Sequence, residues 1–385
     1  MRVVAGVACW LGAVAVAHAD PAPDASPQAS DAPKVTVSGY LETYYAYNFN
    51  QPSNLTTAYR GFDNHTNSFT VENAVLDITG TLGDVSVRLA LQDGHTPAAY
   101  YAAEPSYPAQ AGTGASNADL WRLIQQALIG YRRDKLLLEA GIFLDPIGPE
   151  GLAIKDQWSW SRSDLFVALP FYHAGVRATY ALSDELTAAA FVTNGWNDIV
   201  NVNPDPCVAG QLTYAVAKLS ATATYFGGVE PPTGSPEGQP WRHMFDLSGT
   251  YQATGELAFA WQANTGFEDN PAGRASWYDG AAYAKYRPLA KLWLAARVDA
   301  THEHDAENAA RTIPRLFFPA DDVRSVTLTV AAPIERNLTV MLEYRHDHAS
   351  APMYFQDDVA TGPAGLGIAT ATSQNTLTLG AVGWF

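Results

Sequence analysis

The segment Val85-Ser86-Val87-Arg88-Leu89-Ala90-Leu91-Gln92 places an apolar side chain at every odd position and mainly polar or small ones between them. The same two-residue period recurs at 256–264, with Leu257 and Phe259 in the apolar phase, and again at 291–299. A period of two gives a β-strand one apolar and one polar face. The chain is therefore predicted to be built of half-buried strands, either in a soluble all-β protein or in a transmembrane barrel.

Two classes of connection take turns along the 385 residues. Short connections, several with Gly, Asp or Asn as turn residues, are expected near 80–84, 132–134, 182–185, 217–220, 253–255, 287–290 and 332–337. Long ones are expected near 50–67, 93–119, 143–170, 195–207, 228–240, 267–275, 302–321 and 348–373. Eight loops and seven turns, with both termini on the turn side, predict an all-β transmembrane antiparallel barrel of about 16 strands, with 14 or 18 as alternatives.

The N-terminal segment has the composition of an export signal. Arg2 precedes an uncharged apolar run that ends before Ala17-His18-Ala19. That run is shorter than the ~20 residues that a membrane-spanning helix needs. We therefore predict a signal peptide at 1–19, cleaved after Ala19, a flexible periplasmic leader at 20–33 and the barrel at 34–385.

The C-terminal segment alternates in the same way. Leu377, Leu379 and Phe385 share one phase and the chain stops on the aromatic residue. A terminal Phe resembles the mark by which barrel assembly machinery recognises its substrates, so that machinery is an expected partner. Phe385 is expected on the lipid face of a last strand that pairs with the strand starting near Val35.

Several motifs resemble the OmpL-like β-barrel porin family, also called barrel porin type 2. They lie at 139–148, 161–166, 169–170, 173–177, 194–197, 277–278, 296–299 and 343–347, and so span nearly the whole mature chain. The resemblance implies an outer-membrane location in a Gram-negative bacterium and a porin-like role. It supplies no substrate and no catalytic residues. Ile142 and Leu144 depart from the polar residues that are ordinary at their positions.

Strand phase predicts which charged side chains point into the lumen. These are Glu42, Arg88, Glu139, Arg177, Arg297, Asp299, Glu343 and Arg345, to which Asp246 and Gln262 are added as polar neighbours. Both signs are present. The side chains either set a transverse field across a pore or pair across strands to fill the wall.

The long connection at 143–170 is the candidate constriction. It is the third long loop, and it places Trp158 and Trp160 beside charged residues: Asp145, Glu150, Lys155, Asp156, Arg162 and Asp164. The alternative is an external loop packed against its neighbours.

Four histidines lie in two pairs at the ends of predicted strands, His302 with His304 and His346 with His348. Pairs at i and i+2 lie on one strand face and suit a transition metal, but their phase is lipid-facing, so contact with lipid headgroups at the rim is the favoured interpretation. We predict no metal and no other cofactor.

The overall charge argues against nucleic acid as a partner. The chain has 23 Lys and Arg against 39 Asp and Glu, a net −16, whereas phosphate binding needs clustered basic residues.

No catalytic motif stands out, so the chain is not predicted to be an enzyme. The predicted function is passive diffusion of small hydrophilic solutes or ions through a water-filled barrel. The alternative is a plugged structural or adhesive barrel. Lipid, lipopolysaccharide and a homotrimer are the further expected partners.

Overall fold

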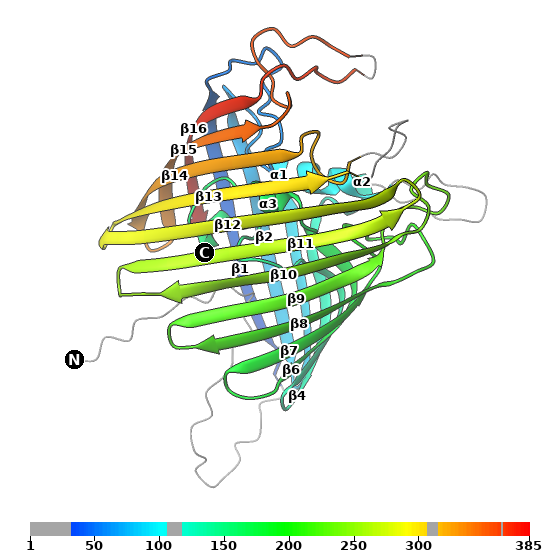
Figure 1. Cartoon of the computed structure of the whole chain (residues 1–385). Coiled ribbons are helices and arrows are strands. Elements are labelled where there is room, and N and C mark those ends of the chain that lie inside the picture. The colour runs from blue at the N-terminus through cyan, green and yellow to red at the C-terminus, as the bar shows by residue number, and fades with distance from the viewer. Residues whose placement is uncertain (1–31, 106–117, 306–314, 363–364) are drawn as a thin grey trace.

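The computed structural model describes residues 32–105, 118–305, 315–362 and 365–385. Sixteen antiparallel strands close into one barrel, and each strand pairs with its neighbours in the chain (Figure 1). The strands are β1 (Lys34–Asn48), β2 (Phe69–Leu82), β3 (Val85–Asp93), β4 (Ile124–Arg133), β5 (Leu136–Leu144), β6 (Tyr172–Ala181), β7 (Leu186–Thr193), β8 (Cys207–Val216), β9 (Leu219–Val229), β10 (Trp241–Gln252), β11 (Leu257–Asn270), β12 (Gly273–Leu289), β13 (Leu292–His304), β14 (Asp322–Glu335), β15 (Leu338–Ala349) and β16 (Ser373–Trp384). The sixteen-strand prediction is confirmed.

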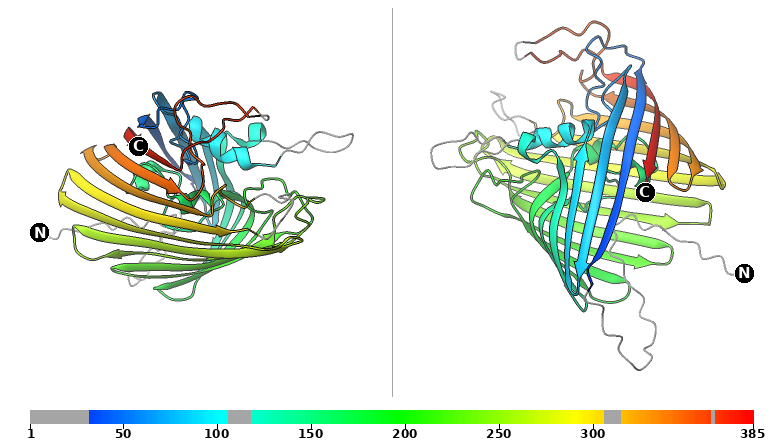
Figure 2. Two further views of the ribbon diagram at one scale, coloured as in Figure 1. Left: turned by 45° about the horizontal axis from the view of Figure 1, so that its top comes forward. Right: turned by 180° about the vertical axis from the view of Figure 1, so that it is seen from behind.

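The short helices all lie in connections. They are α1 (His95–Tyr100), α2 (Ala118–Trp121) and α3 (Asp164–Val167), with the 3₁₀ turns η1 (Tyr101–Ala103) and η2 (Ile154–Asp156). Helix α3 lies inside the ring of strands, against β12, β13 and β14 (Figures 1 and 2). No helix in the described ranges has the length and apolar character needed to cross a membrane.

The barrel closes where the first and last strands meet. β1 pairs with β16 from Tyr40 opposite Trp384 to Asn48 opposite Thr376. Beyond β16, the backbone of Phe385 exchanges two hydrogen bonds with Gly39, and its ring lies over Gly39 on the outer face with 72% of the residue exposed. The predicted pairing and outward direction of Phe385 are both confirmed.

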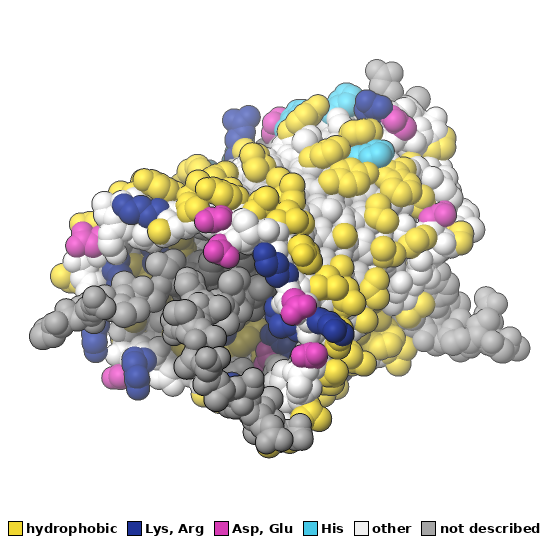
Figure 3. Space-filling view, turned by 90° about the horizontal axis from the view of Figure 1, so that it is seen from below, with side chains coloured by type: hydrophobic (Ala, Val, Ile, Leu, Met, Phe, Trp, Pro, Cys, Tyr) yellow, Lys and Arg dark blue, Asp and Glu magenta, His cyan; other side chains and the backbone are white. Residues whose placement is uncertain are grey.

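Alternation sorts the side chains as expected. Val85, Val87, Leu89 and Leu91 are exposed on the outer wall, whereas Arg88 points inward. Hydrophobic side chains cover much of the wall in Figure 3, and charged side chains gather around one end. Strands of uneven length make this wall uneven: β3 to β8 have 8 to 10 residues, and β10 to β16 have 12 to 17.

Seven tight turns mark one end of the barrel, here called the turn end; the long loops mark the other, the loop end. The predicted long loop at 267–275 is wrong, because β11 and β12 continue their alternation to a turn of only Pro271 and Ala272. Gly273 follows with a φ of 126°, which a residue without Cβ adopts readily. The predicted signal peptide lies outside the described residues, and so does the leader apart from its last residues.

Candidate pore constriction

The connection between β5 and β6, residues 145–171, enters the barrel; we call it the inner loop. Its base is closed by a hydrogen bond from the Asp145 amide to the Phe171 carbonyl, 3.0 Å. Asp145 also accepts from the Ile147 amide and lies 3.0 Å from His173 Nε2. Burial raises the pKa of the Asp145 carboxyl. This buried turn directs the chain inward.

Gly148 then crosses close to the far wall. Its φ is 81°, and a Cβ at this position would approach the Gln262 amide to 2.5 Å. Only glycine combines that backbone conformation with so close an approach. Gln211 donates to the nearby Pro146 carbonyl at 3.3 Å. The loop thus spans the lumen from β5 towards β8 and β11.

Wall carboxylates bind the backbone of the inner loop. Glu42 accepts from the Ile154 amide at 2.5 Å. Glu343 accepts from the Trp160 and Ser161 amides at 2.6 and 2.9 Å. Ile154 is the first residue of η2, and Trp160 and Ser161 lie outside helices and strands. The carboxylates therefore satisfy N–H donors that burial would otherwise leave unpaired.

Wall arginines bind the carbonyls of the same segment. Arg297 donates to the Ser161 carbonyl at 2.6 Å and to the Arg162 carbonyl at 3.1 Å. Arg345 donates to the Arg162 carbonyl and pairs with Asp164 at 2.6 Å. The wall therefore carries donors and acceptors that match both sides of the loop backbone.

Each of these arginines also has a carboxylate two residues further along its strand. Asp299 lies 3.0 Å from Arg297 and accepts from the Asp164 amide at 3.0 Å. Asp347 occupies the same place beside Arg345. Burial raises the pKa of the Asp164 carboxyl, and the Arg345 guanidinium offsets this increase only in part. Buried charges at this density persist only when paired and hydrogen-bonded.

Trp160 anchors the centre of the inner loop. It is fully buried, and its indole N–H donates to Glu72 at 2.7 Å. Its ring lies against Gly380 of β16, where a Cβ would come within 2.3 Å. Arg162 lies 3.7 Å from Glu72 and donates to the Gly151 carbonyl. The loop is thereby fixed to the β1–β2 and β16 walls as well.

Loops at the loop end close over this arrangement. Arg60, in the connection after β1, pairs with Asp63 at 2.7 Å and with Asp347 at 3.2 Å. Although burial opposes it, Arg60 holds the pKa of Asp63 below its usual value. Phe62 packs edge-on against Phe166 of α3, with ring centroids 6.0 Å apart. These contacts therefore bury the inner loop on the side that faces the loop end.

On the turn-end side of the inner loop, charged side chains of the barrel wall keep contact with solvent. Arg88 pairs with Asp77 across β2 and β3, and Arg177 pairs with Glu139 across β5 and β6, both at 2.6 Å. Arg177 also lies over the Phe143 ring, 4.8 Å from its centroid. We call this accessible region of the lumen the vestibule.

The structure thus divides the sequence-predicted site residues into two groups. Arg88, Glu139 and Arg177 lie in the vestibule. Those in or against the inner loop are Glu42, Asp145, Glu150, Lys155, Asp156, Arg162, Asp164, Arg297, Asp299, Glu343 and Arg345. Lys155 and Asp156 pair with one another at 2.7 Å and keep solvent contact.

Sequence reasoning missed Glu72, Arg60, Asp63 and Asp347. Asp347 shares the strand phase of Glu343 and Arg345, so its position in the sequence already indicates that it faces the lumen. Glu72 was hidden, because a register shift at Glu42 changes the phase of β2 against β1.

The histidine pairs lie on the outer face near the loop end. His302 Nδ1 is 3.1 Å from Asp322, and His346 Nδ1 is 2.9 Å from Asn375; His304 and His348 are exposed. Within the part of the chain that the structure describes, no three His, Cys, Asp or Glu side chains are grouped as a metal site would require.

The model of the family described as "Putative beta-barrel porin-2, OmpL-like" matches residues 34–385. The chain belongs to this family. It is thus a porin of the Gram-negative outer membrane, and the inner loop lies across the lumen of that porin.

Solved porin structures share the fold at low sequence identity. The outer-membrane channel DcaP of Acinetobacter baumannii aligns with a TM-score of 0.59 and 13% identity, covering 94% of this chain and 100% of that one. An anion-selective porin from Comamonas acidovorans gives 0.59 and 12%, covering 92% and 100%. OmpT of Vibrio cholerae gives 0.56 and 13%, covering 93% and 99%. No curated protein matches the chain in sequence.

Proposed function

We propose that this porin lets small hydrophilic solutes and ions diffuse passively, with the inner loop as constriction and the vestibule as its turn-end entrance. The family assignment supports the porin role. The charged, solvent-contacting lumen wall at Arg88 and Arg177 supports hydrophilic permeants, because a polar lumen accommodates water where an apolar one would not.

The unequal exposure of the ion pairs in the vestibule supports a proposal about ion preference. The Arg88 side chain is 38% exposed and its partner Asp77 19%; Arg177 is 21% exposed and Glu139 15%. Within the vestibule, a permeating ion therefore meets more cationic than anionic surface. We propose a weak anion preference set by the lumen, despite the net −16 of the whole chain. The porin from Comamonas acidovorans, which has the same fold, is described as anion-selective.

Reversal potentials in planar bilayers under a KCl gradient test both parts. We expect ion-conducting channels with chloride favoured over potassium. The double variant R88Q/R177Q should shift the reversal potential towards potassium. R274Q/R324Q removes the same charge from exposed positions on the outer wall and should leave it unchanged. A purified, folded barrel that conducts no ions would contradict the porin role; potassium preference in the wild type would contradict the lumen argument alone.

The role of the inner loop needs its own test. Deleting residues 157–163 removes the segment held by Glu343, Arg297 and Arg345. If this segment is the constriction, single-channel conductance should rise in the deletion variant. An unchanged conductance would argue against it.

For assembly, we propose a homotrimer in which the β3–β8 wall faces a second copy. β7 has only 8 residues, fewer than the ~9–11 that a tilted strand needs to cross a bilayer. If these short strands faced a neighbouring barrel, the bilayer would not have to thin around them. One structure of OmpT from Vibrio cholerae is described as a trimer form. Lipid and lipopolysaccharide around the taller strands, and assembly machinery at Phe385, complete the proposed partners. Native mass spectrometry from detergent should show three chains.

A further inference from the structure

Lys285 adds a positive charge to the lumen wall near the turn end of β12. It has the inward strand phase of the buried residues Ala281 and Tyr283, and it lies four residues before the end of the strand. Its direct neighbours on the two adjacent strands are small, Ala258 of β11 and Ala295 of β13. Lys285 is only partly buried, so its side chain keeps contact with solvent inside the barrel.

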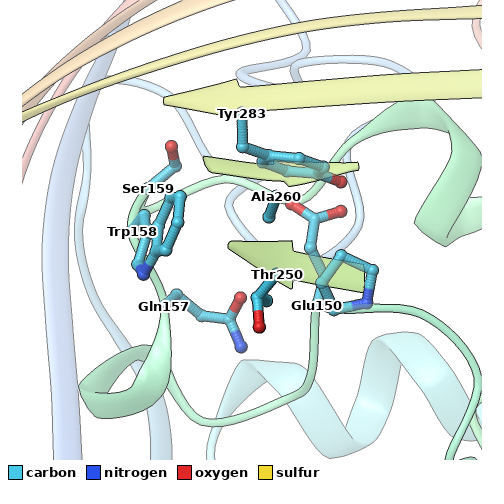
Figure 4. A pocket seen from close by; sticks show the side chains of 8 residues that line it. Glu150, Gln157, Trp158, Ser159, Thr250, Ala260 and Tyr283 are labelled. Atoms are coloured by element: carbon cyan, nitrogen blue, oxygen red, sulfur yellow. The ribbon is translucent and has the colours of Figure 1, made fainter. Parts of the chain in front are cut away.

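Two indole rings hold the Lys285 ammonium. Its Nζ lies 5.6 Å from the centroid of the Trp158 ring and 4.5 Å from that of the Trp293 ring. Both distances are within the ~6 Å range of cation–π contacts, which stabilise a cation without neutralising its charge. Trp158 belongs to the inner loop, and Figure 4 shows it across a narrow space from Tyr283, which precedes Lys285 by two residues on β12. The charge of Lys285 therefore lies beside the proposed constriction.

The Lys285 charge has no partner of opposite sign in the described ranges of the chain, where every ion pair is made by another cation. Glu150, on the inner loop close to Tyr283, already pairs with Arg297 at 2.9 Å. The charged side chain that acts on Lys285 is Arg287, a second cation. An ionisable side chain at membrane depth is costly and marks a functional position by default, most of all where it faces a water-filled lumen.

The two vestibule arginines differ from Lys285 in this respect. Arg88 and Arg177 each pair with a carboxylate at 2.6 Å. Farther away than the separation of the two charges, the fields of such a pair largely cancel, whereas the field of a lone charge does not. The ring order places β7 to β11 between β12 and the Arg177 strand, and β13 to β16, β1 and β2 between β12 and the Arg88 strand. Lys285 therefore acts from the other side of the lumen.

We propose that Lys285 is a main determinant of ion selectivity in this porin. Its unpaired charge attracts anions to the turn-end side of the constriction and repels cations from it. Lys285 is thus a specificity residue in addition to Arg88 and Arg177, and the inner loop positions it through Trp158. The inference rests on the proposed porin function and attributes the larger part of the anion preference to one side chain.

Reversal potentials of single variants in planar bilayers under a KCl gradient test this role. K285Q should lower the ratio of chloride to potassium permeability at least ~2-fold, the effect of one charge within about a Debye length, ~8–10 Å, of the permeating ions. K285R keeps the charge and should keep the wild-type ratio.

Two controls match the charge change. The double variant D77N/R88Q removes a cation together with its carboxylate partner and should change the ratio less than K285Q does. Lys218 is exposed in the turn after β8, so K218Q removes the same charge from the turn end outside the lumen and should leave the ratio unchanged. Heat-modifiable migration on gels establishes that each variant is folded.

A cysteine variant tests the same charge in a channel that has already folded. In K285C channels, aminoethyl methanethiosulfonate attaches an ammonium and should restore the wild-type ratio. Sulfonatoethyl methanethiosulfonate attaches an anion and should lower the ratio below that of unlabelled K285C. Cys207 is buried, so wild-type channels treated with either reagent should keep their ratio.

Two results would overturn the role of Lys285: a wild-type ratio in folded K285Q and in both labelled forms of K285C, or a change in K285Q no larger than that in D77N/R88Q. In conducting channels, either result leaves the porin role intact. A potassium-preferring wild type whose ratio still falls in K285Q would support the role of Lys285 and contradict only the overall anion preference. A folded wild-type barrel without conductance contradicts the porin role and removes this inference with it.

Discussion

Replacing Glu343 by glutamine should loosen the inner loop in a measurable way. One carboxylate oxygen accepts from the Trp160 amide at 2.6 Å and the Thr329 hydroxyl at 2.9 Å, and the other accepts from the Ser161 amide at 2.9 Å. Glutamine keeps one acceptor oxygen and turns an NH₂ group towards the donors on the other side. Losing the charge assistance and leaving one buried N–H unpaired should cost ~2–3 kcal/mol. The loop segment should therefore open roughly 30- to 150-fold more often.

Hydrogen–deuterium exchange of peptides that cover 157–163 measures this opening, because exchange of protected amides reports the free energy of local unfolding. E343Q should accelerate exchange there and leave peptides from β8 and β9 unchanged. E335Q removes the same charge from an exposed position at the end of β14 and should match the wild type. Acceleration of less than ~3-fold in folded E343Q would refute the view that the carboxylate holds the loop.

Two other predictions concern barrel closure and the loop end. A Cβ at Gly39 would approach the Phe385 ring to 2.9 Å, so G39V should lower the folded yield at least ~2-fold, whereas G80A, where the space is open, should fold normally on heat-modifiability gels. Burial and the nearby His65 lower the pKa of His95, in α1, from 6.5 to about 4. Between pH 6.5 and pH 4, His95 is therefore protonated only when its loop has left its packed position. The packed state of the loop loses stability as the pH falls from 6.5 towards 4. Limited proteolysis should cleave this loop faster at pH 5 than at pH 7, and H95Q should remove that difference; equal rates in the wild type would contradict the linkage.

Much of the fold could be predicted because it depends on local patterns. Alternation at Val85 to Gln92 defines a strand and its faces, and turn residues mark where strands end. The hairpin around Pro271 was missed for the same reason: polar residues such as Glu268 and Asp269 look like loop sequence, although Glu268 faces inward and pairs with Arg242 at 3.0 Å.

The site was harder to predict, because its contacts depend on register between distant segments. Residue types and phase indicated that Arg297 and Glu343 face the lumen, but not that they bind backbone groups of the inner loop. Trp160 and Glu343 are 183 positions apart in the chain. The bulge beside Glu42 and the close approach at Gly380 are likewise visible only when the barrel is closed.

This distance in the chain also determines an order of events during folding. The inner loop emerges between β5 and β6, yet its binding groups lie on β1, β13 and β15. Contacts of such sequence separation form late, because the loop-closure entropy must be met before they contribute. An assembling chain that has not yet paired β1 with β16 has no complete surface to receive the loop. We therefore expect the inner loop to dock last, so a barrel that is not yet closed should have a wider lumen than the finished one.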